Sequence, residues 1–121
     1  MKRLTTKEEA IMQILWQLEN AFMKEIWEEL EEPRPPITTT ASIVKKLETA
    51  GFIDHESFGR NHRYFPKIKK EDYRQSSFKN LVDNYFGGSS KQLLSYFVDK
   101  ENIDETELDE LLQEIKKKKE R

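Results

Sequence analysis

Hydroxyl and basic side chains gather in one stretch of the chain, residues 37–70. Short hydroxyl side chains can approach base edges and phosphates, while longer cations reach the phosphate backbone from further along the same helix. The chemistry that this arrangement suits is recognition of DNA. The hydroxyl residues predicted to make these contacts are Thr38, Thr39 and Ser42, and the cations that follow are Lys45 and Lys46.

The spacing predicts that these side chains lie on a short amphipathic helix within residues 37–50. Thr40, Val44 and Leu47 recur at i, i+4 and i+7, so we expect them to face a core while the hydroxyls and lysines lie outside. Gly51 supplies the left-handed position that commonly ends a helix. Such a pattern is also typical of an ordinary capped surface helix, so the helix alone leaves both interpretations open.

A β-hairpin is predicted next, with strands at residues 52–56 and 62–66. Arg60 and Arg63 lie around its tip, as in a wing that follows a minor groove or a line of phosphates. Residues 37–70 contain seven basic and three acidic residues, so this segment has a net charge of +4. The whole chain has a net charge of −2. This local basic surface favours a DNA-binding wing over a plain solvated hairpin.

Two earlier helices complete the expected DNA-binding domain, residues 1–72. The first is predicted from Thr5 to about residue 19, where Thr5 and Glu8 form a capping box. The second is predicted over residues 22–31 and ends at a proline-rich segment. The order helix, helix, helix, hairpin is that of a winged helix-turn-helix, in a chain that is mostly α with a small β-hairpin.

Residues 73–121 are predicted to form a helical dimerisation domain of three amphipathic helices. Ser89 with Gln92 and Asp104 with Glu107 have the spacing of capping boxes that open two of them. The apolar stripes have little to pack on within one chain, so we expect them to meet a second copy. The residues predicted to dimerise are Phe78, Leu81, Tyr85, Leu94, Phe97, Leu108, Leu111, Leu112 and Ile115.

The order and spacing of several motifs resemble the penicillinase-repressor family of bacterial transcriptional regulators. The resemblance implies a homodimeric repressor that binds a palindromic operator through winged-helix domains and dimerises through its C-terminal helices. It covers nearly the whole chain. The residues that carry it are Leu4, Thr5 and Trp16, then Thr38, Thr39, Ser42, Val44, Lys46, Leu47, Gly51, Phe52 and Ile53, and finally residues 85–88 and 94–98.

The resemblance also implies a mode of release, in which a membrane sensor-protease system leads to a cut in the dimerisation helix between an asparagine and a phenylalanine. The matching bond here is Tyr96–Phe97, where tyrosine replaces the asparagine. Ser42 stands where threonine is usual, and Lys46 replaces an arginine and so lacks its bidentate fork. The copper-responsive branch uses a Cys-x-Cys motif, which a chain without cysteine cannot provide.

Other classes of function are less well supported. The only acid–base groups for neutral pH are His55 and His62, which we interpret as a phosphate contact and a solvated strand residue. No catalytic residue, metal or cofactor is therefore expected. A winged helix that binds protein would need apolar or acidic residues on the recognition helix. A winged-helix regulator controlled by a small ligand or by a protein partner, instead of cleavage, is the alternative.

The N-terminus and the hydropathy of the chain bear on its location. The first residues lead straight into a charged helix without an apolar signal region, and no apolar run approaches the roughly 20 residues that span a bilayer. The chain is therefore expected to be cytoplasmic, with no membrane insertion.

Overall fold

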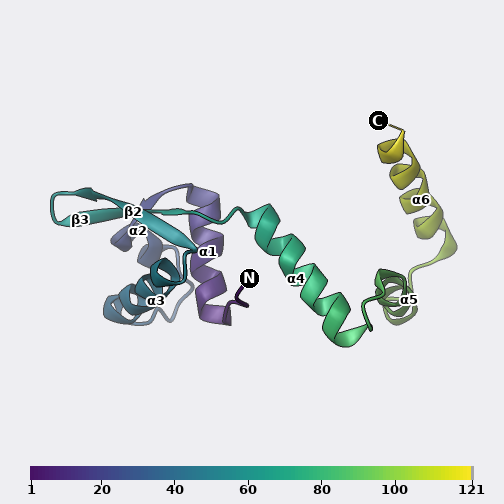
Figure 1. The fold of residues 1–121 in the computed structure, drawn as a ribbon, viewed down its shortest axis with the longest axis horizontal. Helices are drawn as coiled ribbons and strands as arrows, with labels where there is room; N and C mark the ends of the chain where they lie inside the picture. The colour runs from purple at the N-terminus through teal and green to yellow at the C-terminus, as the bar shows by residue number, and fades with distance from the viewer. Residues whose placement is uncertain (121) are drawn as a thin grey trace. The chain divides into compact units, whose positions relative to one another are not determined.

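The computed structural model describes residues 1–120 and consists of two compact units, Met1–Ser77 and Phe78–Arg121. Figure 1 shows the helices and strands in chain order. Unit 1 contains three helices and a small sheet, followed by the first turns of a fourth helix. Its elements are α1 (Thr6–Leu18), β1 (Ala21–Phe22), α2 (Met23–Glu28), α3 (Ile37–Thr49), β2 (Ile53–Phe58) and β3 (Asn61–Pro66). The predicted mostly α architecture with a winged-helix order is confirmed.

α1 begins at the predicted capping box. The Thr5 hydroxyl accepts a hydrogen bond from the backbone N–H of Glu8, and the Glu8 carboxylate accepts one from the backbone N–H of Thr5. Lys2 adds an ion pair of 2.9 Å to the same carboxylate. Burial by itself raises the pKa of Glu8, but the bonds from Thr5 and Lys2 together outweigh it, and the pKa lies below its usual value.

Residues 21 and 22 form a strand that the sequence does not predict. Ala21 pairs with Tyr64 and Phe22 with Arg63, so the sheet has three strands in the order β1-β3-β2. The predicted second helix over residues 22–31 is therefore wrong at both ends, because α2 covers only Met23–Glu28. A two-residue strand carries no periodic signal, and its pairing partner lies far away in the chain.

The hairpin is longer and its turn tighter than predicted. β2 continues to Phe58, and β3 starts at Asn61, which pairs with Phe58. Gly59 and Arg60 alone make the turn, and Gly59 has a positive φ of 62°. Two-residue hairpin turns need a positive φ that glycine adopts without strain. Both strands extend toward the turn beyond their predicted ends, through Ser57 and Phe58 on β2 and through Asn61 on β3, because the residues between the two apolar segments pair instead of forming a longer turn.

The core of unit 1 lies between the three helices and the sheet. α3 contributes Thr40, Val44 and Leu47, which are at most 1% exposed and confirm the predicted inner face. Trp16 packs against this core and donates from its indole nitrogen to the carbonyl of Ile68, at 2.9 Å. The buried apolar residues are Leu4, Ile11, Met12, Leu15, Ala21, Ile26, Val44, Leu47, Phe52, Ile53 and Tyr73.

Side-chain hydrogen bonds from Trp27 and Arg34 hold the connection between α2 and α3 in place. The indole N–H of Trp27 donates to the carbonyl of Pro35 at 2.8 Å. The guanidinium of Arg34 donates to the carbonyl of Glu28 at 2.9 Å and lies 5.2 Å from the centroid of the Trp27 ring. These contacts give the proline-rich segment a defined path, and so they set where α3 begins.

Unit 2 is helical, with the second half of α4 (Lys70–Tyr85), then α5 (Ser90–Lys100) and α6 (Glu105–Lys119). The three predicted helices are confirmed. Ser89 accepts a hydrogen bond from the backbone N–H of Gln92, and Asp104 accepts one from that of Glu107, so both residues cap their helices. Among the described residues, none of the helices combines the length and the apolar character that crossing a membrane would require.

Candidate nucleic-acid interface

α3 presents one polar face to solvent, and this face carries all the hydroxyl and lysine residues singled out from the sequence. Its opposite face is fixed in the core by Thr40, Val44 and Leu47. Because the buried face sets the rotation of the helix, it also determines which side chains point outward. The exposed residues are Thr38, Thr39, Ser42, Lys45 and Lys46.

The first turn of α3 has no side-chain cap. Its N-cap residue is Pro36, whose carbonyl accepts from the backbone N–H groups of Thr39 and Thr40. The backbone N–H groups before these have no partner within a helix. Uncapped N–H groups and the positive end of the helix dipole favour an anion such as a phosphate.

The two arginines of the wing differ in their exposure and in their contacts. Arg60 lies in the turn and is exposed. Arg63 is partly buried: its guanidinium lies 4.7 Å from the centroid of the Phe58 ring and 3.4 Å from a carboxylate oxygen of Glu56. Such a partly exposed ion pair contributes little to stability, so Arg63 can exchange Glu56 for a phosphate at small cost.

A cleft of about 490 Å³ joins the beginning of α3 to the wing. Ile37 of α3 and Arg60 of the wing both line it, and so does Lys24 of α2. Lys24 is not among the cations that the sequence pattern predicts to contact DNA. The sequence feature that could have pointed to Lys24 is its isolation, because it is the one basic residue in the acidic segment over residues 19–32.

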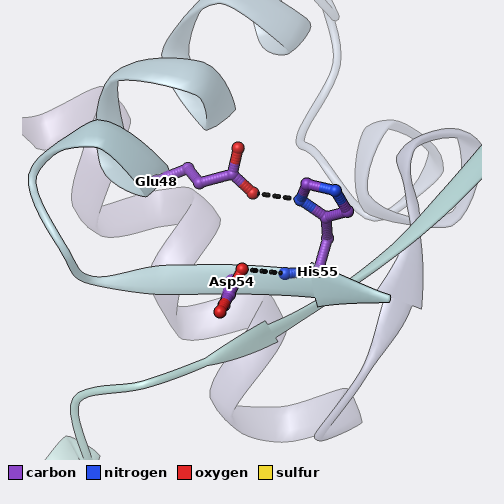
Figure 2. Close-up of side chains that lie close together, drawn as sticks. All are labelled: Glu48, Asp54 and His55. Carbon is purple, nitrogen blue, oxygen red and sulfur yellow. Dashed lines mark hydrogen bonds and ion pairs between the residues drawn. The ribbon is translucent and has the colours of Figure 1, made fainter. Parts of the chain in front are cut away.

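The end of α3 is linked to the wing by a cluster of polar side chains, Glu48, Asp54 and His55, shown in Figure 2. The ring nitrogen Nδ1 of His55 pairs with the Glu48 carboxylate, whose other oxygen lies 3.7 Å from Nζ of Lys45. Asp54 accepts a hydrogen bond of 2.8 Å from the backbone N–H of His55.

These three residues have metal-ligating atoms within 4.8 Å of one another. Each carboxylate already has a partner in the protein: that of Glu48 lies against His55 and Lys45, and that of Asp54 accepts from the backbone N–H of His55. The contact between Glu48 and His55 therefore links the end of α3 to the wing, while the bond to Asp54 stays within β2.

The two histidines lie together on the hairpin. Their rings stack with centroids 4.0 Å apart and planes 6° apart. The strand register explains the contact, because His55 pairs with Tyr64 and Ser57 with His62, which makes the histidines diagonal neighbours on one face. Burial, followed by the Glu48 carboxylate, raises the pKa of the adjacent Tyr64.

The residues predicted to dimerise lie on the helices of unit 2, and most of them are exposed. Tyr85 is 68% exposed and Leu94 55%, whereas Leu108 is half-buried. The others, between 40% and 52% exposed, are Phe78, Leu81, Phe97, Leu111, Leu112 and Ile115. At the matched cleavage bond, Tyr96 is 55% exposed and makes an edge contact with Phe86.

Three helices followed by a paired hairpin, with an exposed basic face on the third helix, define a winged-helix DNA-binding protein. A sequence model of the family described as penicillinase repressor matches residues 4–117. The chain belongs to this family of DNA-binding transcriptional repressors, which are not enzymes. The resemblance drawn from the motifs is thereby confirmed.

Individual relatives agree with the family. The methicillin resistance regulatory protein MecI of Mammaliicoccus sciuri is 26% identical over 116 residues, which cover 95% of this chain and 94% of that protein. The penicillinase repressor of Bacillus licheniformis is 22% identical over 124 residues. This match covers 98% of this chain and 94% of that protein. The solution structure of the DNA-binding domain of the repressor BlaI matches 60% of this chain and 94% of that one, with a TM-score of 0.52 and 25% identity.

Proposed function

We propose that this chain is a homodimeric transcriptional repressor that binds a palindromic operator. The observation that carries the proposal is the outward face of α3, which is polar and basic while its inner face is fixed in the core. In this role α3 enters the major groove, and the wing lies along the adjacent backbone.

The proposed contacts with DNA are of two kinds, from short hydroxyl side chains and from longer cations. Thr38, Thr39 and Ser42 are short enough to reach base edges or the nearest phosphates. The longer cations supply charge to the backbone, which gives affinity without sequence preference. These cations are Lys45, Lys46, Arg60 and Arg63, and Lys24 joins them because it lines the same cleft as Arg60.

The apolar side chains of unit 2 support the dimer. Phe78, Tyr85 and Leu94 are each about half exposed or more in the single chain, at 49%, 68% and 55%. Exposed apolar stripes of this kind mark an interface, and a second copy offers a matching set of stripes. Two coupled winged-helix units can then occupy two half-sites about one helical turn apart.

Release from the operator is proposed to follow proteolysis at Tyr96–Phe97 in α5, with a membrane sensor-protease system as the partner. Both side chains are about half exposed, at 55% and 49%. A bond inside a helix must open locally before a protease can bind it, and a short, mostly exposed helix opens at less cost than the core. The cut would separate α6 from the rest of the chain.

The proposal is tested with an operator selected from a pool of random duplexes by the full-length protein. We expect footprinting to show two protected half-sites related by two-fold symmetry. Ser42→Ala should alter the preference among operator sequences because it removes a hydroxyl from the proposed base-reading face. Selection that yields no preferred sequence, or a single protected half-site, would argue against this function.

A further inference from the structure

Three side chains that can bind a metal ion meet where the end of α3 approaches the wing. Figure 2 shows Glu48 coming from α3, and Asp54 and His55 from β2. Each offers one ligand atom, a carboxylate oxygen or a ring nitrogen, and these atoms all lie within 4.8 Å of one another. The ligand atoms of one tetrahedral zinc ion lie about 3.4 Å apart, because each bond is about 2.1 Å long. A modest rotation of the side chains is therefore sufficient to bring the three atoms onto one ion.

The bonds that the two carboxylates make within the protein leave room for an ion. Asp54 accepts from the backbone N–H of His55 through Oδ1, and an ionised carboxylate can accept through both of its oxygens. Glu48 faces Nδ1 of His55 through Oε2, and its Oε1 lies 3.7 Å from Nζ of Lys45, whose side chain is 75% exposed. An exposed ion pair of this kind contributes little, so a cation can replace Lys45 at small cost.

The ring of His55 is held in place by its neighbours on the hairpin. The ring of His62 stacks on it, and the centroid of the Tyr64 ring lies 5.8 Å from that of His55. A ligand that is already oriented by packing loses little freedom when it binds an ion. The side chains of Glu48 and His55 are 18% and 26% exposed, whereas Asp54 is exposed. The ligands are thus partly sheltered, and an ion can still enter from solvent and keep bound water.

The types of ligand indicate which metals fit. Imidazole nitrogen suits Zn²⁺ and other first-row transition metals, whereas Mg²⁺ and Ca²⁺ prefer ligand sets made of oxygen. Zinc accepts histidine nitrogen and carboxylate oxygen, and it keeps water in the fourth position where the protein supplies three ligands. The sequence did not predict such a site, because only the fold brings Glu48 of α3 to His55 of β2.

We infer that Glu48, Asp54 and His55 bind one divalent transition-metal ion, such as Zn²⁺, with water completing its coordination. The ion takes the place between Nδ1 of His55 and the Glu48 carboxylate, and the ring proton moves to Nε2. It adds two positive charges beside α3 and draws Glu48 away from Lys45, one of the proposed phosphate contacts. The bound ion therefore raises operator affinity, and bound operator raises the affinity for the ion by the same factor. This second part rests on the proposed function, whereas binding of the metal does not.

Metal binding is tested by calorimetric titration of the full chain with Zn²⁺. We expect saturable binding of one ion per chain, and no comparable binding of Mg²⁺. Asp54→Asn keeps an oxygen that can accept from the backbone N–H of His55, and Glu48→Gln keeps an oxygen that can face Nδ1. Each removes a carboxylate and should weaken zinc binding by at least about tenfold, since even residues that only support a ligand have effects of this size.

Glu56→Gln is the matched control, because Glu56 is an exposed acid on the same strand that lies outside the cluster. Its affinity for zinc should equal that of the wild type. In the wild type, the ¹⁵N resonance of Nδ1 of His55 should shift on saturation, as direct coordination requires. Absence of saturable binding, or an affinity for zinc that is the same in the wild type and in either Asp54→Asn or Glu48→Gln, would overturn the inference.

The effect on DNA is a separate measurement. With free zinc buffered at a saturating concentration, the wild-type chain should bind its selected operator several-fold more tightly than in EDTA. Asp54→Asn should show no such difference, and it also reports any effect of zinc on the DNA itself. Operator affinity that zinc leaves unchanged in the wild type would overturn the coupling. If the full chain selects no operator while zinc binding still depends on Asp54, then the proposed function fails and the metal site stands.

Discussion

The hydroxyl of Tyr73 accepts a hydrogen bond from the backbone N–H of Leu4, with 2.9 Å between the two atoms. Tyr73 lies in the first turns of α4, yet it is only 8% exposed, and its ring packs 6.0 Å from that of Phe52 and 5.9 Å from that of Trp16. The sequence pattern placed Tyr73 at the beginning of the predicted dimerisation domain, residues 73–121. Its burial instead ties the beginning of α4 to the N-terminal segment within unit 1.

This bond predicts different costs for two substitutions of Tyr73. Tyr73→Phe keeps the ring and leaves the buried N–H of Leu4 unpaired, so it should lower the free energy of unfolding by about 1–3 kcal/mol. Tyr73→Ala also removes the ring from the core and should cost about 3–5 kcal/mol. Urea denaturation measures both. Equal losses in the two variants would mean that the packing of the ring contributes nothing, and an unchanged stability in Tyr73→Phe would mean that the hydrogen bond contributes nothing.

The lowered pKa of Glu8 predicts a dependence of stability on pH. A carboxyl whose pKa is lower in the folded state stabilises the fold at pH values above its ordinary pKa, about 4.3, and this contribution disappears as the pH falls through the lower folded value. Glu8→Gln preserves the capping geometry and removes the charge. We expect the wild type to be more stable than Glu8→Gln at pH 7, with a gap that narrows toward pH 3 in urea titrations. A gap of constant size would contradict this assignment.

The proposed contact between Arg63 and the DNA backbone predicts how a substitution of Arg63 changes the salt dependence of DNA binding. Arg63→Ala should weaken binding to all duplexes and reduce the slope of log K against log salt by about one, and Lys46→Ala should do the same. Glu56→Ala is the matched control, because it removes the partner of Arg63 in the free protein. It should leave the slope unchanged or steeper. An unaltered slope in Arg63→Ala would exclude the wing arginine from the phosphate contacts.

The exposed stripes predict that a charge on unit 2 will separate the subunits. Phe97→Asp or Leu111→Asp should produce monomers, since each places a charge where an apolar side chain is proposed to meet the second copy. Ser95→Asp is the control, a charge on the same helix at a position outside the predicted interface. Sedimentation at micromolar concentration reports the result. A wild-type protein that sediments as a monomer would refute the proposed dimer.

The cleavage proposal predicts the behaviour of a shortened chain. Residues 1–96 retain α3 and the wing but lack α6 and part of α5. Such a chain should keep its phosphate contacts within each half-site and lose operator affinity, because two half-sites are no longer bound as a coupled pair. Titration against the selected operator compares the two chains. Equal affinity and equal salt dependence would show that the cut cannot serve as the switch.

The parts of the fold that could be predicted from the sequence follow local rules. Thr5, Ser89 and Asp104 cap their helices because a hydroxyl or carboxylate at the N-cap position lies close to the free N–H three residues later. The inner face of α3 follows from periodicity alone. Gly51, with a φ of 84°, ends that helix as its position indicated.

The features that escaped prediction depend on residues far apart in the chain. β1 exists because Ala21 meets Tyr64, and the histidine stack exists because of the hairpin register. The absence of a hydrogen-bond partner for the buried hydroxyl of Thr40 likewise depends on which segments pack against α3. Periodicity reports which face of an element is buried, and it carries no information about which element covers that face.

The strand order has a consequence for unwanted association. β3 is the central strand, so β2 keeps one edge without a strand partner. An open edge of this kind can template pairing with another chain and lead to aggregation. Asp54 and Glu56 occupy alternate, exposed positions on β2, so two wings meeting edge to edge would bring like charges together. The acidic residues of the wing thus oppose the pairing of two copies through their sheets.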